Sequence, residues 1–273
     1  MSIAEYNARK AANEGIPYQE LFYLWHKVKK WEFILICTTC VFSFVLVFWF
    51  YLLPDIMLGL KNVIEWFNCF LILIGIALNW YANIHAGPIA EYERVGGFVD
   101  DAFETRILEK SMAVPYYTNG GMPLGVERMA ANGFENCFFT NSISEKMTKK
   151  IAIKNMGFFS LFLILAYLNV NVSNITALLQ IVLGSVLLEG LIKHWYFRRS
   201  IKELFERYKR LYDNVPDAVR FQAEAVYLAV RYEKYLAYYN YPIDTKIYTR
   251  LNLRLSVEWE NMKERYNIRP KEN

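Results

Sequence analysis

The chain has little histidine, and it lacks the short motifs that mark several large enzyme classes. Three histidines are present among 273 residues, and they form no cluster with cysteine or carboxylate residues. There is no Gly-x-x-x-x-Gly-Lys phosphate loop, no Gly-x-Ser-x-Gly nucleophile elbow and no His-Glu-x-x-His zinc helix. We therefore expect a protein that is not an enzyme, with no catalytic residues, no bound metal and no resident cofactor.

Cysteine is also scarce, and the four cysteines predict neither a disulfide framework nor a metal site. Cys37, Cys40 and Cys69 lie within apolar runs, and Cys137 lies in a segment expected to face the reducing cytoplasm, where disulfides are rare. Cys37-Thr-Thr-Cys40 has the spacing of a redox pair, but inside a membrane we expect two small apolar side chains that fill space. We expect no signal peptide, because residues 1–30 are polar.

Apolar residues, by contrast, make up 55% of the chain. Four apolar runs approach the ~20 residues that a helix needs to cross the hydrocarbon core of a bilayer. The third run is short, and it crosses only if residues 151–153 or its own Asn- and Val-rich end add length. We therefore predict an all-α integral membrane protein with four transmembrane helices in two hairpins. The four runs are 31–53, 63–84, 156–170 and 175–197.

Basic residues are unevenly distributed around these runs. The loop 54–62 carries only Lys61, and the loop 171–174 carries no lysine or arginine, whereas the segments before, between and after the hairpins are rich in both. By the positive-inside rule, we expect both termini and the segment between the hairpins to face the cytoplasm. The net charge of +4 follows from this topology, so we expect no nucleic-acid partner.

The expected organisation is a series of five segments. The spacing of aromatic and aliphatic residues predicts a helix before the first run and a continuation of the fourth run as a helix into the cytoplasm. Two further helices are expected, one at about 217–239 and one that starts within 241–245 and runs to about 266. The segments are an N-terminal cytoplasmic helix (1–30), transmembrane hairpin 1 (31–85), a cytoplasmic central module (86–154), transmembrane hairpin 2 (155–197) and a cytoplasmic helical tail (198–273).

The central module is predicted to be two helices joined by a long turn at 114–125, which is rich in glycine, proline and tyrosine. Gly96-Gly97 interrupts the apolar stripe of the first helix, where each glycine costs ~1 kcal/mol. Either this helix starts after the glycine pair, or its backbone closely approaches another group. Long loops on rigid scaffolds often carry binding residues, so we expect the ligand site of the protein in this module.

The module contains residue types that suit a nucleotide. Tyrosines of the turn can stack on a base, and arginines can hold phosphates. In the alternative interpretation, the aromatic residues pack the module and the arginines pair with Glu91, Glu104 or Glu135. Amides on the second helix likewise either fix packing by hydrogen bonds or meet a polar ligand. The candidate ligand-binding residues are Arg94, Asp101, Thr105, Arg106, Tyr116, Tyr117, Asn119, Arg128, Asn132 and Asn136.

Four polar residues lie inside the second and fourth apolar runs, and we regard them as candidate pore or gating residues. The amides of Asn68 and Asn79 either bond to neighbouring helices, for roughly 1 kcal/mol, or line a pore. Glu189 either pairs with Lys193 one helical turn later or lies on a water-filled path. Both interpretations of Glu189 can hold in different states of the protein.

Two short motifs and the layout of the chain carry a resemblance to a known family. The motifs are Phe138-Phe139-Thr140 and Gly97-Phe98-Val99-Asp100-Asp101-Ala102-Phe103-Glu104-Thr105, an acidic and aromatic helix start that ends in Phe-x-Thr. With its hairpins, module and helical tail, the chain resembles the four-transmembrane effectors encoded beside nucleotide second-messenger synthases in bacterial CBASS-type anti-phage systems. It has Asp100-Asp101 where that family has an amide–acid pair.

The resemblance implies a pore-forming or membrane-disrupting effector of the bacterial inner membrane. A phage-triggered synthase would supply a cyclic nucleotide, which the cytoplasmic region would bind as a regulatory ligand. The spans would then rearrange or assemble with further copies of the chain, breach the bilayer and cause growth arrest or cell death.

Two other functions remain open from the residues alone. The first is a membrane-embedded, metal-dependent enzyme acting on lipid, with Asp100, Asp101, Glu104 and Glu135 as metal ligands or acid/base groups. The second is a non-catalytic scaffold that recruits a partner through its tail helices.

Overall fold

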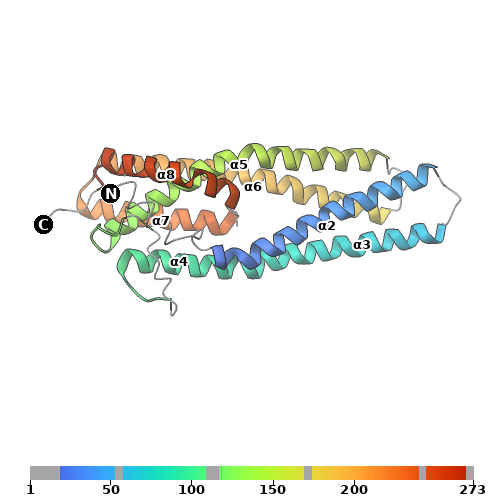
Figure 1. The fold of residues 1–273 in the computed structure, drawn as a ribbon, viewed down its shortest axis with the longest axis horizontal. Helices are drawn as coiled ribbons and strands as arrows, with labels where there is room; N and C mark the ends of the chain where they lie inside the picture. The colour runs from blue at the N-terminus through green and yellow to red at the C-terminus, as the bar shows by residue number, and fades with distance from the viewer. Residues whose placement is uncertain are drawn as a thin grey trace. The chain divides into compact units, whose positions relative to one another are not determined.

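The structure, a computed structural model, describes residues 19–52, 58–108, 117, 119–168, 174–239 and 244–268. Every regular element in these ranges is a helix, which confirms the predicted all-α class (Figure 1). The predicted N-terminal helix lies outside the described residues up to residue 18. The elements are α2 (Gln19–Leu52), α3 (Leu58–Tyr81), the π-helix η1 (Ala82–Ala86), α4 (Gly87–Phe103), α5 (Val126–Leu168), α6 (Asn174–Asp213), α7 (Ala218–Tyr239) and α8 (Thr245–Arg265).

The chain divides into two compact units. Unit 1 contains residues 1–23, 88–147 and 197–273, and unit 2 contains residues 24–87 and 148–196. Four helical stretches contribute residues to both units without a break: α2, α5, α6, and the continuous run of α3, η1 and α4. The assignment of these residues to cytoplasmic and membrane segments stays a prediction.

Unit 1 is organised around an aromatic cluster on α5. Residues 131–140 of this helix are all buried, and the ring of Phe134 is fully enclosed. This ring stacks on Tyr208 and Tyr212 of α6, with 5.5 Å between ring centroids in both pairs, and it meets Trp259 of α8 edge-on at 5.4 Å. Large rings dominate core energetics, and such pairs add about 0.5–1.5 kcal/mol each beyond the area they bury. The cluster therefore ties α5, α6 and α8 into one core.

Local sequence signals fix the ends of the tail helices. Asp217 accepts a hydrogen bond from the backbone N–H of Arg220 (3.0 Å) at the start of α7. Asp244 accepts from the N–H groups of Lys246 and Ile247 (3.0 and 3.1 Å) at the start of α8. Such caps satisfy backbone donors that have no partner inside the helix. The helix predicted at 217–239 agrees with α7 to within one residue. The helix predicted to start within 241–245 and to run to about 266 agrees with α8, which begins at the last residue of that stretch.

The Gly96-Gly97 pair lies inside α4, so the helix does not start after it. A Cβ atom on Gly96 would come within 2.7 Å of the Leu108 side chain. Close approach, the second of the two predicted explanations, therefore accounts for this glycine. Asp100 holds the segment that brings Leu108 back, since its carboxylate accepts from the Thr105 hydroxyl (2.8 Å) and from the N–H groups of Ile107 and Leu108.

Unit 2 has the opposite distribution of side chains. Large apolar residues such as Trp66, Phe70 and Tyr167 are 58–80% exposed. Its fully buried residues include small or polar ones, among them Ala82 and Asn68. Within the described residues, one helical run, Asn62–Phe103, is long and apolar enough to cross a membrane, and it contains the predicted span 63–84. The four-span arrangement stays a prediction.

Candidate functional site

A polar face of α5 lies inside unit 1. Arg128, Asn132, Glu135 and Asn136 follow one another at helical spacing, so they lie on one side of the helix. All four are at most 8% exposed. Burial of polar groups is costly unless they are hydrogen-bonded, and each of these four side chains has a bonded partner elsewhere in the unit. We call these residues and their partners the α5 network.

Arg128 fixes the turn that precedes α5. Its Nη2 donates to the carbonyl oxygens of Gly120 (2.8 Å) and Met122 (3.1 Å), and its Nη1 donates to the carbonyl of Asp101 (3.2 Å). The Glu104 carboxylate lies farther from Nη1 of Arg128, at 3.5 Å, and the Glu104 side chain is 65% exposed. The guanidinium of Arg128 is therefore occupied mainly by backbone acceptors.

Asn132 joins α4 to the same turn. Its Nδ2 donates to Oδ2 of Asp101 on α4 (2.7 Å), and its Oδ1 accepts from Nδ2 of Asn119 (3.0 Å). Nδ2 of Asn119 also donates to Oε2 of Glu135 (2.8 Å). A chain of hydrogen bonds thus runs from α4 through α5 and the turn to a buried carboxyl.

Glu135 is the group in this network that can change charge near neutral pH. Burial raises the pKa of Glu135 to about 8, and the carboxylates of Glu260 and Asp101 add to the rise. Lys263 and the hydrogen bond from Asn119 oppose it. Chemically, the network can hold a proton on Glu135 at neutral pH and release it in mild alkali.

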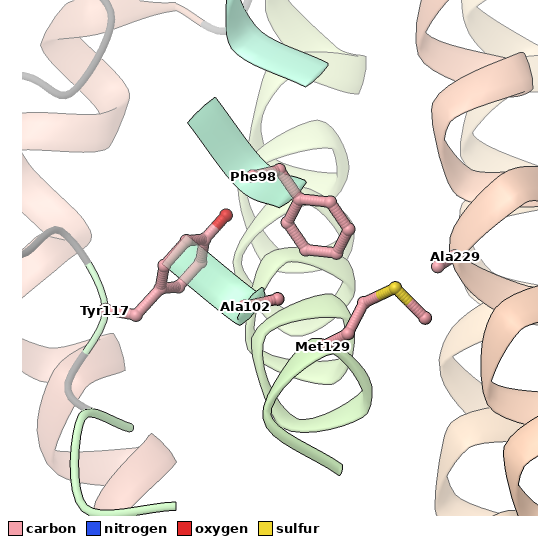
Figure 2. Close-up of a cluster of buried hydrophobic side chains, with 5 residues drawn as sticks. All are labelled: Phe98, Ala102, Tyr117, Met129 and Ala229. Atoms are coloured by element: carbon pink, nitrogen blue, oxygen red, sulfur yellow. The ribbon is translucent and has the colours of Figure 1, made fainter. Parts of the chain in front are cut away.

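Asn136 connects the network to a small apolar cluster. Its Nδ2 donates to the hydroxyl of Tyr117 (2.8 Å). The Tyr117 ring packs edge-on against Phe98, with 6.2 Å between centroids. Figure 2 shows Tyr117 entering from the turn and Phe98 from α4. The full cluster is Phe98, Ala102, Tyr117, Met129 and Ala229.

Arg94 lies in a separate, part-buried ion-pair group, whose side chains are 12–14% exposed. It bonds Glu91 one turn earlier on α4 (2.8 Å) and Glu233 on α7, with one contact to Glu233 at 3.2 Å. Burial raises the pKa of the Glu233 carboxyl, and the charge of Arg94 opposes that rise. The charge of Arg94 is therefore paired inside the protein, with Glu91, which the alternative interpretation named, and with Glu233, which it did not.

The structure brings together six of the ten candidate ligand-binding residues. Four others fall elsewhere: Arg94 is in the ion-pair group, Thr105 bonds Asp100, Arg106 is exposed, and Tyr116 lies outside the described residues. Sequence reasoning missed Glu233, which is 139 residues from Arg94 and carries no local signal. The six gathered residues are Asp101, Tyr117, Asn119, Arg128, Asn132 and Asn136.

The candidate pore residues of unit 2 are also bonded. Oδ1 of Asn79 accepts from Lys29 on α2 (2.7 Å) and from Asn83 (2.8 Å), as expected for an amide that joins neighbouring helices. Asn68 is 1% exposed. Glu189 pairs with Lys193 at 2.6 Å, and both side chains are about half exposed.

Of the carboxylates proposed for a lipid enzyme, Asp101 lies near enough to Glu135 to raise its pKa, whereas Asp100 bonds a different segment. Asp100 accepts from the segment after α4, while Asp101 bonds Asn132 on α5. The described part of the chain contains no group of three or more His, Cys, Asp or Glu residues placed to hold a metal ion. Asp100, Asp101 and Glu135 accept hydrogen bonds within the protein, while the Glu104 side chain is 65% exposed.

Comparisons with protein-family models, with curated proteins and with solved structures find no match for this chain. Its function is therefore inferred from its own residues and their geometry.

Proposed function

We propose that the protein is a membrane effector of bacterial anti-phage defence, gated by a cyclic nucleotide. In this proposal, unit 2 lies in the inner membrane and unit 1 lies in the cytoplasm and binds the ligand. Further copies of the chain assemble with it, and the assembly forms a pore or disrupts the bilayer, which arrests growth or kills the cell.

The side-chain distribution of unit 2 supports the membrane part of the proposal. Lipid is as apolar as leucine, so membrane helices gain little by hiding large apolar residues and pack instead through small and hydrogen-bonding ones. Unit 2 exposes Trp66 and Tyr167 and buries Ala82, Ala86 and Asn68. On a soluble protein, large exposed apolar patches mark interaction sites, and the proposal assigns lipid as the partner of these residues.

One observation carries the gating part of the proposal. The helical run from Leu58 to Phe103 has an apolar beginning and ends at the α5 network, where Asp101 bonds Asn132. A ligand shifts an equilibrium only by binding one state better than the other. A ligand that favours one arrangement of unit 1 would act on the membrane helix directly through this continuous run.

The proposal is tested with purified protein in liposomes that contain a fluorescent dye. Cyclic mono-, di- and trinucleotides are added one at a time, and we expect dye release with one of them. Release that is equal with and without every nucleotide would contradict the gating proposal.

Two neighbouring aspartates provide a matched pair for the same assay. Asp101→Ala removes the side-chain bond from α4 to Asn132 on α5, whereas Asp100→Ala affects only bonds to residues 105–108. We expect nucleotide-dependent release to be lost in the Asp101 variant and retained in the Asp100 variant. Equal release from both variants would show that the tie between α4 and α5 does not transmit the signal.

A further inference from the structure

A pocket of about 660 Å³ lies in unit 1, where α6 ends and α7 begins. Its size is within the range of about 300–1,000 Å³ that is usual for small-molecule sites. The turn at 214–217 forms part of its wall, and residues of both helices form the rest. The lining residues are Arg207, Arg210, Leu211, Asn214, Pro216, Arg220, Glu224, Tyr227 and Leu228.

The lining of this pocket is strongly basic, with three arginines and one glutamate. Arg207 pairs with Glu203 on the same helix (3.3 Å), and Arg220 is 3.7 Å from Glu224. Arg210 has no ion pair among the described residues and is exposed. Exposed pairs of this kind contribute little energy, so the arginines can exchange their partners for a bound anion.

The rest of the pocket suits an organic ligand with a planar ring. Leu211 and Leu228 are buried to 2–3% exposure and provide apolar surface, while the Tyr227 ring is half exposed. Aromatic rings stack on nucleobases with little sequence preference, and arginine binds phosphate through paired N–H groups. Asn214 adds an amide that can donate and accept hydrogen bonds.

We infer that this pocket binds the phosphate groups of a small ligand that also carries a planar ring, as a cyclic nucleotide does. This inference rests on the proposed function and gives its ligand a location. The α5 network is a poorer location, since Arg128 and Asn132 already bond protein groups there. In the pocket, by contrast, cationic side chains face open space.

The test measures binding to the full-length protein in nanodiscs by isothermal titration. The probes are cyclic mono-, di- and trinucleotides and inorganic pyrophosphate, each in nanodiscs of phosphatidylcholine and again in nanodiscs with phosphatidylglycerol. The variants are Arg210→Glu and Arg220→Ala. The control is Arg254→Ala on α8, because Arg254 is also an exposed arginine with a glutamate four residues later, Glu258 at 3.4 Å.

We expect one nucleotide to bind the natural protein, with Kd raised about 10- to 100-fold in each pocket variant, the effect of losing one hydrogen bond to a charged group. The control should bind like the natural protein. Pyrophosphate should bind more weakly, because it lacks the ring. Equal affinity in all variants, or the binding of no nucleotide, would overturn the inference. It would also be overturned if the pocket bound only the headgroup of phosphatidylglycerol.

The dye-release assay separates this inference from the proposed function. If a nucleotide still causes dye release from liposomes that contain a pocket variant, the proposed function stands and the pocket is not the binding site. If the nucleotide binds the pocket but releases no dye, the site stands and the function is wrong.

Discussion

The two units place the same residue type in opposite surroundings. Phe134 in unit 1 has no exposed surface and is enclosed by rings from α6 and α8, whereas Phe70 in unit 2 is 58% exposed. Unit 1 follows the rule of a water-soluble domain, with its largest side chains inside. In unit 2 the large apolar residues divide, since Trp25 is 3% exposed whereas Trp66 and Phe70 are 58–70% exposed. If unit 2 lies in lipid, as proposed, substitutions will act differently in the two units.

Phe134→Ala tests this comparison with the largest expected effect. The substitution removes a ring that touches five others, and a Phe→Ala change in a core costs about 3–5 kcal/mol. Phe70→Ala is the matched control, and we expect its free energy of unfolding to change by about 0.5 kcal/mol or less. Denaturant unfolding in detergent, followed by circular dichroism, measures both. Similar losses in the two variants would remove the distinction between the units.

Arg94→Ala should lower the free energy of unfolding by about as much as a large-to-small substitution in the core. The change leaves the carboxylates of Glu91 and Glu233 buried without their cation, and breaking a buried pair on one side costs about 3–5 kcal/mol. Arg254→Ala removes an exposed pair with Glu258 and should cost at most about 1 kcal/mol. The same unfolding measurement compares them, and a small loss for Arg94→Ala would mean that water reaches this group.

Gly133→Ala should destabilise unit 1 by about 1–3 kcal/mol, the usual cost of overpacking a core. A Cβ on Gly133 would overlap the Tyr208 hydroxyl, which packs against the helix at this point. Gly157 lies on the same helix but has no atom within 4 Å of the added Cβ. Gly157→Ala should therefore raise stability by up to about 1 kcal/mol through helix propensity. Opposite signs for two glycines of α5 would sharpen the contrast between the units.

Local signals were enough to predict much of the fold. Pro216 and Asp217 end one helix and cap the next, so the start of α7 is readable from two adjacent residues. The Gly96-Gly97 pair left two explanations open, a helix start or a close approach, and the residue that makes the close approach, Leu108, could not be read from spacing. The second helix of the central module and the third apolar run were predicted as separate segments. In the structure α5 continues through both, because no proline interrupts residues 126–168.

The candidate site was predicted only in part, because its contacts join distant stretches. The helical spacing of Asn132 and Asn136 predicted a shared polar face. Their partners, Asp101 and Tyr117, come from α4 and from the turn, 31 and 19 residues away along the chain. The charge of Arg94 predicted a carboxylate partner, and Glu91 is one, but Glu233 becomes a neighbour only when α7 packs against α4. Side-chain periodicity carries no information about such packing.

The smallest predicted effect is the change in the free energy of unfolding over one pH unit. The Glu135 carboxyl has a pKa of about 8 in the folded protein, against about 4.3 in an unfolded chain. Between these values the folded state keeps a proton that the unfolded state has lost. Stability therefore falls as the pH rises from about 4.5 to about 8, by at most about 1.4 kcal/mol per pH unit. Below this window both states are protonated, and this contribution is constant.

Glu135→Gln should remove this slope, because glutamine keeps the shape of the protonated acid and does not titrate. Asn119→Ala should instead extend the decline to higher pH, since it removes the hydrogen bond that favours the carboxylate and so raises the pKa of the folded state further. Thermal unfolding at pH 6 and pH 7 compares Glu135→Gln with the natural protein, and the same measurement at pH 8 and pH 9 compares Asn119→Ala with it. If the change of stability with pH were unchanged in Glu135→Gln, another group would be responsible for it. The buried polar face of α5 would then not titrate in this pH range.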